Sequence, residues 1–228
     1  VQNMLITKGI YGSRKKEEIM EDYAGKTVVI TGGTSGLGFA LAKILGGRGA
    51  SIVITGRREE KGAEAVEKLQ AEGVSARYLR QDVSSESDWN NLAFTVKSEF
   101  GGVDYLFNNA GVMLQPNALM KTSVSDWKWI MDTNFWGSLY GLRVFSGLMF
   151  TQPEGGRIVT TASTAGVSAF SGWAPYSVTK TALVRLVENY QAEAIKFELD
   201  KVKYNVSLPG VFESEIANST LHRNEEYN

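Results

Sequence analysis

Three residues in the second half of the chain carry side chains that could move a proton to or from a substrate oxygen: Ser163, Tyr176 and Lys180. Tyr176 and Lys180 are four residues apart in a segment with a helical pattern, so they share one face of the helix. A free tyrosine has a pKa of roughly 10, and a nearby ammonium group lowers this pKa by stabilising the phenolate. Ser163 can donate a hydrogen bond to the same oxygen. The trio predicts acid–base chemistry on a carbonyl or an alcohol.

A Tyr-x-x-x-Lys pair also occurs by chance, so the elements around it must support this interpretation. From Lys26 onward, short β-branched runs alternate with longer helical patterns. This alternation predicts a parallel sheet covered by helices on both faces, with ligands at the carboxyl ends of the strands. The expected fold class is α/β: a doubly wound parallel sheet of Rossmann type, in three layers and one domain. The expected strands are 27–31, 51–55, 77–81, 105–108, 157–161 and 203–208, and the expected helices are 37–45, 59–72, 85–100, 126–149 and 176–199.

The domain is expected to span residues 26–228, after an N-terminal arm of residues 1–25. The arm mixes basic and acidic residues without an apolar stretch, so it does not resemble a secretory signal or a transit peptide. The expected helix 126–149 carries more apolar residues than one helix face usually needs. Subunit packing and burial in the core both explain this excess.

Composition excludes several classes of function. The 228 residues have a formal net charge of -1, which does not favour binding to nucleic acid or to anionic lipid. The chain has no cysteine and a single histidine, His222, so a metal site of the usual zinc type is not expected. No run of about 18 apolar residues predicts a transmembrane helix. The expected location is the cytoplasm, where the absence of disulfides is typical.

A glycine-rich turn follows the first expected strand, from Thr31 to Gly38. Glycine permits positive φ and close backbone approach, and the N–H groups at the start of the next helix favour a pyrophosphate. The spacing departs from G-x-G-x-x-G, because starting at Gly36 the third glycine would fall on Leu41. The position between a strand and a helix nevertheless favours a dinucleotide site over a purely structural turn.

The residues after the second strand indicate which dinucleotide is bound. An NAD site places an acidic residue there, on the ribose 2′-hydroxyl. This chain instead has Gly56, Arg57 and Arg58. Because the planar guanidinium of arginine suits a 2′-phosphate, Arg57 favours NADP(H) over NAD(H). The alternative is that both arginines are solvated loop residues.

Taken together, these motifs resemble those of the short-chain dehydrogenase/reductase family, in its single-domain branch. The resemblance runs from Lys26 to about Val211. It includes the turn Thr31–Gly38 as T-G-x-x-x-G-x-G, the pair Asp82-Val83 and the run Asn108-Asn109-Ala110-Gly111. It continues through Asn134, Ser163, Tyr176-x-x-x-Lys180 and Pro209-Gly210. Each motif is modest evidence, but their order along the chain is specific.

The resemblance implies a role for each matched position. It implies a catalytic tetrad of Tyr176, Lys180, Ser163 and Asn134, in which Asn134 holds a water beside Lys180. It implies cofactor contacts from the glycine turn, from the ends of three further strands and from the tetrad. The implied cofactor residues are Gly32, Ser35, Gly36, Leu37, Gly38, Arg57, Asp82, Val83, Asn109, Ala110, Gly111, Tyr176, Lys180, Pro209, Gly210 and Val211. Homodimers or homotetramers are common in this family, so we expect an oligomer.

The substrate side of the site is expected to be apolar. Phe170 and Trp173 lie between Ser163 and Tyr176 in sequence, and Met113, Leu114 and Phe212 are candidates to join them; none of these can clamp a carboxylate or phosphate. The expected reaction is therefore interconversion of an apolar ketone and a secondary alcohol, with Tyr176 as general acid or base.

The C-terminal part departs from the family pattern. After Pro209-Gly210 the residues 211–228 are mostly polar, and no final strand is readable there. Either the C-terminal strand is missing or the pocket closes in another way; a truncated or mobile C-terminus would leave the substrate pocket open. Two alternative functions therefore remain: a dinucleotide-binding sensor or scaffold without turnover, and an NAD-dependent alcohol dehydrogenase.

Overall fold

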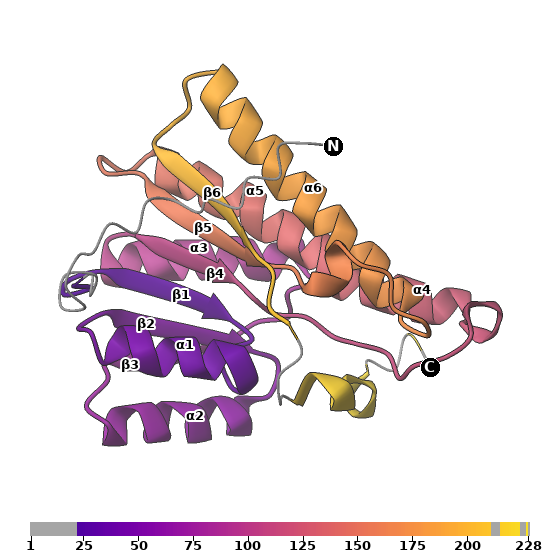
Figure 1. Ribbon diagram of the computed structural model, residues 1–228. Coiled ribbons are helices and arrows are strands. Elements are labelled where there is room, and N and C mark those ends of the chain that lie inside the picture. The colour runs from indigo at the N-terminus through magenta and orange to yellow at the C-terminus, as the bar shows by residue number, and fades with distance from the viewer. Residues whose placement is uncertain (1–21, 211–214, 224–226, 228) are drawn as a thin grey trace, which may run out of the picture.

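The computed structural model describes residues 22–210, 215–223 and 227, which form a layered α/β arrangement (Figure 1). Its centre is a 6-stranded sheet in the order β3-β2-β1-β4-β5-β6, with every pair parallel. The chain builds outward from β1 to one edge, returns to the middle, and builds outward to the other edge. This order confirms the predicted doubly wound topology. The strands are β1 (Thr27–Thr31), β2 (Ser51–Gly56), β3 (Ala76–Arg80), β4 (Tyr105–Asn108), β5 (Gly156–Thr161) and β6 (Val202–Ser207).

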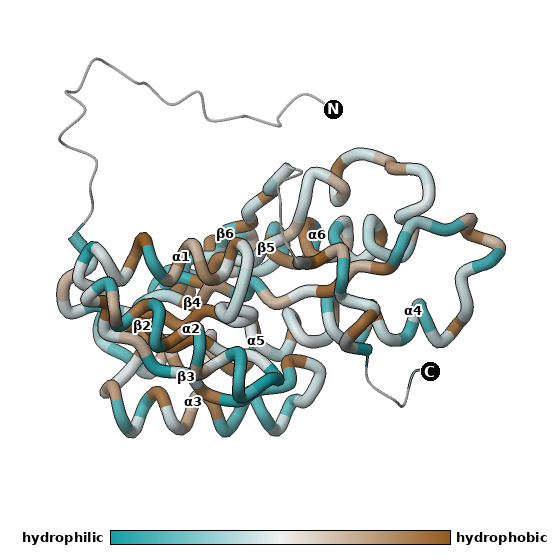
Figure 2. Tube along the Cα trace, turned by 90° about the horizontal axis from the view of Figure 1, so that it is seen from below, coloured by the Kyte–Doolittle hydropathy of each residue, from teal (hydrophilic) through white to brown (hydrophobic). Residues whose placement is uncertain are grey.

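Six α-helices connect these strands and cover the two faces of the sheet. One core lies under α1 and α2, where Ile30 of β1 and Leu69 of α2 are fully buried. The other lies under α3, α5 and α6, where Val29 of β1 meets Trp89 and Phe145. Neighbouring residues of β1 thus enter opposite cores, as the two-residue period of a strand requires, and Figure 2 shows hydrophobic strands in the middle of the molecule. The helices are α1 (Gly36–Gly46), α2 (Glu59–Ala71), α3 (Glu86–Phe100), α4 (Val124–Met131), α5 (Gly137–Phe150) and α6 (Ala174–Lys196).

The expected helix 126–149 is interrupted, which corrects the prediction of one regular helix. It forms α4 and α5, joined by a π-helical turn over Asp132–Trp136. Such wide turns are rare and are frequent at functional sites, and this one contains the fully buried Asn134. Five of its apolar side chains, those of Trp129, Ile130, Leu142, Phe145 and Met149, are buried in the cores, whereas Trp136 is 43% exposed.

The segment after β6 forms a short helical wall and, among the described residues, no further strand. A 3-10 helix, η4 (Glu215–His222), lies beside the carboxyl ends of the strands (Figure 1). Ile216 and Tyr227 pack against the cluster that contains Trp129, Ile130 and Tyr176. Each helix in the described part of the chain is too short or too polar to cross a membrane.

Two glycines of α5 provide a test of core packing. A Cβ added at Gly141 would lie 2.6 Å from the Trp89 ring, and that ring is held by its hydrogen bond to Val83 and by an edge contact with Phe145. Gly141→Ala should therefore lower the free energy of unfolding by about 1–3 kcal/mol in a chemical denaturation experiment. A Cβ at Gly147 meets nothing within 4 Å. Gly147→Ala is the matched control and should raise stability by up to about 1 kcal/mol; equal effects of the two changes would contradict this packing.

Candidate active site

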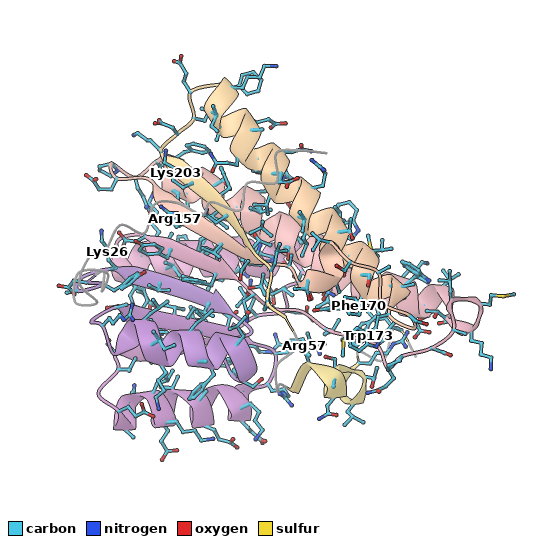
Figure 3. The ribbon with its side chains drawn as sticks, in the orientation of Figure 1. Lys26, Arg57, Arg157, Phe170, Trp173 and Lys203 are labelled. Carbon is cyan, nitrogen blue, oxygen red and sulfur yellow. The ribbon has the colours of Figure 1, made fainter. Side chains whose placement is uncertain are left out.

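One large pocket lies at the carboxyl edge of the sheet, where a doubly wound fold binds its ligands. Its volume is about 780 Å³, which is within the range of small-molecule and cofactor sites. It extends from the glycine turn after β1 to Ser163, Tyr176 and Lys180. Figure 3 shows Arg57, Phe170 and Trp173 towards this side of the molecule, whereas Lys26, Arg157 and Lys203 lie at the amino ends of their strands. The predicted residues in its walls are Gly32, Ser35, Gly36, Leu37, Gly38, Arg57, Asp82, Val83, Asn109, Ala110, Gly111, Met113, Ser163, Phe170, Trp173, Tyr176, Lys180, Pro209 and Gly210.

The glycine turn presents backbone rather than side chains to the pocket. Gly32 and Gly36 have φ of 64° and 53°, in the left-handed region that favours glycine. A Cβ added at Gly38 would lie 2.4 Å from the Gly32 carbonyl oxygen, so no larger residue fits there. At the start of α1, Ser35 makes no side-chain capping hydrogen bond, whereas Ser85 caps α3 in the usual way. The first N–H groups of α1 thus remain available to an anion.

Hydrogen bonds between strand ends hold the floor of the pocket. The Thr31 hydroxyl at the end of β1 accepts the N–H groups of Asn109 and Ala110, each at 2.9 Å. The Asn109 amide donates to the Thr31 carbonyl and accepts from the Thr161 hydroxyl at the end of β5. One asparagine therefore connects β1, β4 and β5 at the edge where the site lies.

Ser163, Tyr176 and Lys180 lie together, as the sequence predicted. Ser163 follows β5, and its Oγ accepts the Ala165 N–H at 3.1 Å, which leaves the hydroxyl hydrogen for another acceptor. Tyr176 is in the first turn of α6, after Pro175. One turn later, the Lys180 ammonium lies 5.5 Å from the centre of the Tyr176 ring and donates to the Thr161 carbonyl at 2.8 Å.

The pKa of Tyr176 is raised in the chain without cofactor, not lowered as expected. Burial raises the pKa of Tyr176, and its hydrogen bond with Ser163 only partly opposes this effect. Burial also lowers the pKa of Lys180 to about 8, because the ammonium is taken out of water and has no carboxylate partner among the described residues. Desolvation of both groups, which the Tyr-x-x-x-Lys spacing does not reveal, therefore outweighs the charge of the lysine.

The side chain of Asn134 bonds to two segments of the protein. Its Oδ1 accepts the Val112 N–H at 2.7 Å, and its Nδ2 donates to the Val112 carbonyl and to the Thr179 hydroxyl. Both amide hydrogens are therefore engaged, and the side chain is fully buried. Asn134 thus connects the π-helical turn to Val112, in the segment after β4, and to Thr179 of α6, the residue before Lys180.

The end of the pocket beside β2 is rich in positive charge. Arg57, Arg58 and Lys61 all line it, and Asp82 is the one carboxylate among the described lining residues. The Asp82 carboxylate accepts hydrogen bonds from the Ser84 N–H and hydroxyl. Glu59 and Glu60 are exposed in the first turn of α2, where negative charge interacts favourably with the helix dipole.

The opposite end of the pocket is largely apolar. Met113, Phe170 and Trp173 line it as predicted, while Leu114 contacts a smaller neighbouring cavity. Sequence reasoning missed η4, which contributes Ile216, Ala217, Asn218, Ser219 and Leu221 to the same walls. Of the two alternatives for the C-terminal segment, these contacts favour a pocket that is closed in another way on this side. Val211 and Phe212, which were also candidates, lie outside the described residues.

The residues of the pocket fit a dinucleotide. The close glycine backbone and the uncapped start of α1 suit a pyrophosphate, and the cations beside β2 suit a further anionic group. In the described part of the chain, no group of three or more His, Cys, Asp and Glu side chains could hold a metal ion. The fold and the site together define a dinucleotide-binding α/β oxidoreductase.

Comparison with known proteins identifies the family. The family model described as short chain dehydrogenase matches residues 26–225. The chain is 30% identical over 208 residues to the C alpha-dehydrogenase of Sphingobium sp. (strain NBRC 103272 / SYK-6), covering 91% of this chain and 67% of that protein. It is 36% identical over 204 residues to the A-factor type gamma-butyrolactone 1'-reductase (1S-forming) of Streptomyces virginiae, covering 88% and 77%.

A solved structure supports the same assignment. A short chain dehydrogenase/reductase from Burkholderia phymatum in complex with NAD has a TM-score of 0.87 and 33% identity, covering 92% of this chain and 74% of that one. The chain therefore belongs to the short-chain dehydrogenase/reductase family. It is an oxidoreductase that acts on CH–OH donors, in a family that uses NAD(P).

The buried lysine makes a testable contribution to stability. The pKa of Lys180 is about 8 in the folded chain against an ordinary value of 10.5, so the unfolded chain binds more protons between these pH values. The cost of burying the charge is fully present below pH 8 and is relieved as pH rises towards 10.5. Lys180→Met removes this cost and should therefore have a higher free energy of unfolding than the unchanged chain at pH 7.5. Because the unchanged chain gains stability as the pH rises, the difference between the two free energies should shrink by roughly 2 kcal/mol between pH 7.5 and 10.

The measurement is urea denaturation of both chains at several pH values in that window. Because all other titrating groups are shared, the difference between the two curves isolates Lys180. Lys203→Met is the control, since Lys203 is an exposed residue at the amino end of β6 and should give no such pH dependence. A difference that stays constant from pH 7.5 to 10 would show that Lys180 is not held in a charge-excluding site.

Proposed function

We propose that this chain is an NADP(H)-dependent oxidoreductase that interconverts a carbonyl and a secondary alcohol on an apolar substrate, with Tyr176 as general acid and base. The observation that carries the proposal is the single pocket that joins the glycine turn to Ser163, Tyr176 and Lys180. A phosphate-binding turn and an acid–base group at opposite ends of one cavity suit a dinucleotide that exchanges a hydride with a substrate beside the tyrosine.

The proton chemistry follows from the environment of Tyr176. Because burial raises its pKa, the phenol is protonated at neutral pH and can donate its proton to the oxygen of a carbonyl undergoing reduction. The Ser163 hydroxyl, whose hydrogen is not used by the Ala165 contact, donates to the same oxygen and stabilises the developing charge. The Lys180 ammonium beside the ring stabilises the phenolate that is left.

Asn134 is proposed as a positioning residue. Its three side-chain hydrogen bonds fix Val112, which follows the predicted cofactor residue Gly111, and Thr179, which precedes Lys180. A Cβ added at Gly111 would lie 3.3 Å from the Asn134 Oδ1 and 3.4 Å from the Lys180 Nζ, so these three residues meet at one point. A shift of Asn134 would therefore move the lysine relative to the tyrosine.

The cofactor assignment rests on the shape and the charge of the pocket. We assign the turn residues Gly32, Ser35, Gly36, Leu37 and Gly38, which line the pocket, to the pyrophosphate, and Lys180 to the ribose nearest the reaction. Asp82 and Val83 are assigned to the adenine, Asn109, Ala110 and Gly111 to the strand ends beneath the adenosine ribose, and Pro209 and Gly210 to the nicotinamide end. Arg57, with Arg58 and Lys61 in the same wall, supports NADP(H) over NAD(H), because a 2′-phosphate needs cationic hydrogen-bond donors.

The substrate and the assembly are proposed in coarser terms. Met113, Phe170, Trp173 and Ile216 support a substrate that is apolar around its reacting carbon. We also propose a homodimer or a homotetramer, supported by the exposed Trp136 beside Tyr140 on the outer face of the α4–α5 segment.

Tyr176→Phe tests the acid–base assignment. The change removes the phenolic hydroxyl and keeps the ring, so kcat for ketone reduction should fall by about 100- to 10,000-fold. The dissociation constant for NADPH, followed by cofactor fluorescence, should change less than about two-fold, because the turn and the strand ends are untouched. Turnover close to that of the unchanged chain would refute the mechanism. Cofactor binding by the unchanged chain with no turnover on a broad carbonyl panel would instead favour a sensor or scaffold.

Arg57→Ala tests the cofactor preference. Loss of a charge-assisted hydrogen bond of about 1.5–3 kcal/mol should raise the KM for NADPH by roughly 10- to 100-fold. The KM for NADH should stay within about two-fold, since NADH has no 2′-phosphate. Arg157→Ala is the matched control, because Arg157 lies at the amino end of β5 and donates to Asn205. An unchanged KM for NADPH in Arg57→Ala would remove the basis for the NADP assignment.

A further inference from the structure

One wall of the pocket is a short helix that belongs to neither helical layer of the fold. Figure 1 shows this helix, η4, at the carboxyl edge of the sheet. Its Ile216 and Leu221 line the pocket, and Ile216 also packs against the cluster that contains Tyr176. A 3-10 helix has poorer hydrogen-bond geometry than an α-helix and rarely exceeds four residues. The 8 residues of η4 therefore need support from outside their own backbone.

Arg223, the residue after η4, connects this wall to the start of α4. Its Nη1 donates to the Asp126 carboxylate, and its Nη2 donates to the Ser125 hydroxyl at 3.0 Å. The guanidinium carbon lies 5.4 Å from the centre of the Trp129 ring. The backbone N–H of Arg223 donates to the Thr220 carbonyl, so this anchor is joined directly to the last turn of η4. Three contacts of one side chain therefore fix the end of the helix.

The ion pair of this anchor is shielded from water. The Arg223 and Asp126 side chains are 14% and 23% exposed, against 75% and 49% for Arg185 and Glu188, which form an ion pair on α6. Burial alone would raise the pKa of Asp126, but hydrogen bonds from Ser123 and Arg223 hold this pKa below its ordinary value. The carboxylate is therefore ionised at neutral pH. Loss of one partner of a shielded pair leaves the other charge uncompensated, so it has a larger effect than loss of an exposed pair.

The helix that carries the anchor is itself firmly placed. Trp129 and Ile130 of α4 are buried in the cluster that contains Tyr176. A second tether joins the C-terminal segment to the other end of α4, where the Tyr227 hydroxyl donates to the Asp132 carboxylate at 2.7 Å. The position of η4 is therefore set by a helix that also packs beneath the tyrosine proposed to move the proton.

We propose that Arg223 is a positioning residue that sets the substrate range, because it holds η4 on α4 so that Ile216 and Leu221 contact an apolar substituent of the substrate. This inference rests on the proposed function, which places the reacting carbonyl at Tyr176. Arg223 is not among the described residues that line the pocket, so it acts through η4 and not by contact with the substrate. The preferred ketones then carry an apolar group long enough to reach η4.

The test uses 2-pentanone, 2-heptanone and 2-nonanone, which differ only in their number of methylenes. For the unchanged chain, kcat/KM should rise by up to about four-fold for each methylene that is buried against the wall. Arg223→Met keeps an apolar stem on the Trp129 ring and removes the guanidinium. It should lower kcat/KM for 2-nonanone by roughly ten-fold, mainly through KM, and for 2-pentanone by less than about two-fold. Arg223→Lys keeps a cation for Asp126 and should recover part of the preference for the longer ketone.

Two variants serve as controls. Arg185→Met makes the same substitution at the exposed ion pair of α6 and should leave the dependence on chain length unchanged. Ser123→Ala weakens the cap of α4 at the Asp126 Oδ2, whereas Arg223 uses Oδ1, so this variant should lose stability and keep the dependence. An unchanged dependence in Arg223→Met would overturn the inference. An equal loss in Ser123→Ala would also overturn it, because general loosening of α4 would then be the cause.

Spin labelling separates this inference from the proposed function. Because the chain has no cysteine, Leu221→Cys gives a single attachment site for a nitroxide, and Leu221 is 76% exposed, so a label fits there. The electron paramagnetic resonance spectrum should show a more mobile label when Arg223→Met is added, and no change when Arg185→Met is added. Equal mobility in all three chains overturns the inference, whether or not the ketones are reduced. A more mobile label in Arg223→Met, without reduction of any of the three ketones by NADPH or NADH, supports the anchor and counts against the proposed function.

Discussion

The site depends on the alignment of three strand ends in a parallel sheet. Parallel pairing brings the carboxyl ends of β1, β4 and β5 to one edge, and the hydrogen bonds of Asn109 to Thr31 and Thr161 fix them relative to one another. The glycine turn leaves β1 at this edge, and Ser163 follows β5. The Lys180 ammonium donates to the carbonyl of the same Thr161. A single short network therefore sets the distance between the glycine turn and the group of Ser163, Tyr176 and Lys180.

Burial is the second constraint, and it acts in opposite directions on the two neighbouring titratable groups. It raises the pKa of Tyr176 and lowers that of Lys180, so the neutral form of each is favoured. The folded chain thus bears an energetic cost at a place where packing alone would favour apolar residues. Such a cost is typical of residues retained for chemistry, because stability and activity make different demands on the same position.

Much of this arrangement could be predicted from the sequence because it is local. Strand and helix periods, the glycine turn and the Tyr-x-x-x-Lys spacing are short-range patterns, and most strand boundaries agree with the structure to within one residue. The contacts that were missed join distant segments. Arg223 reaches Asp126 across 97 residues, and Asn134 reaches Val112 and Thr179 across 22 and 45. No residue spacing indicates such contacts, since they depend on how the elements pack.

The wide turn between α4 and α5 has a further consequence for the geometry of the whole layer. An α-helix rotates about 100° per residue, so one additional residue within a turn changes the direction in which every later side chain projects. The π-helical turn lets α4 direct Trp129 and Ile130 towards the cluster beneath Tyr176, while α5 directs Phe145 into the sheet core. The turn therefore sets the rotation of α5 about the helix axis relative to α4. Removing a single residue from the turn would rotate α5 by about 100° relative to α4. The apolar side chains of α5 would then no longer face the sheet core while those of α4 face the cluster around Tyr176.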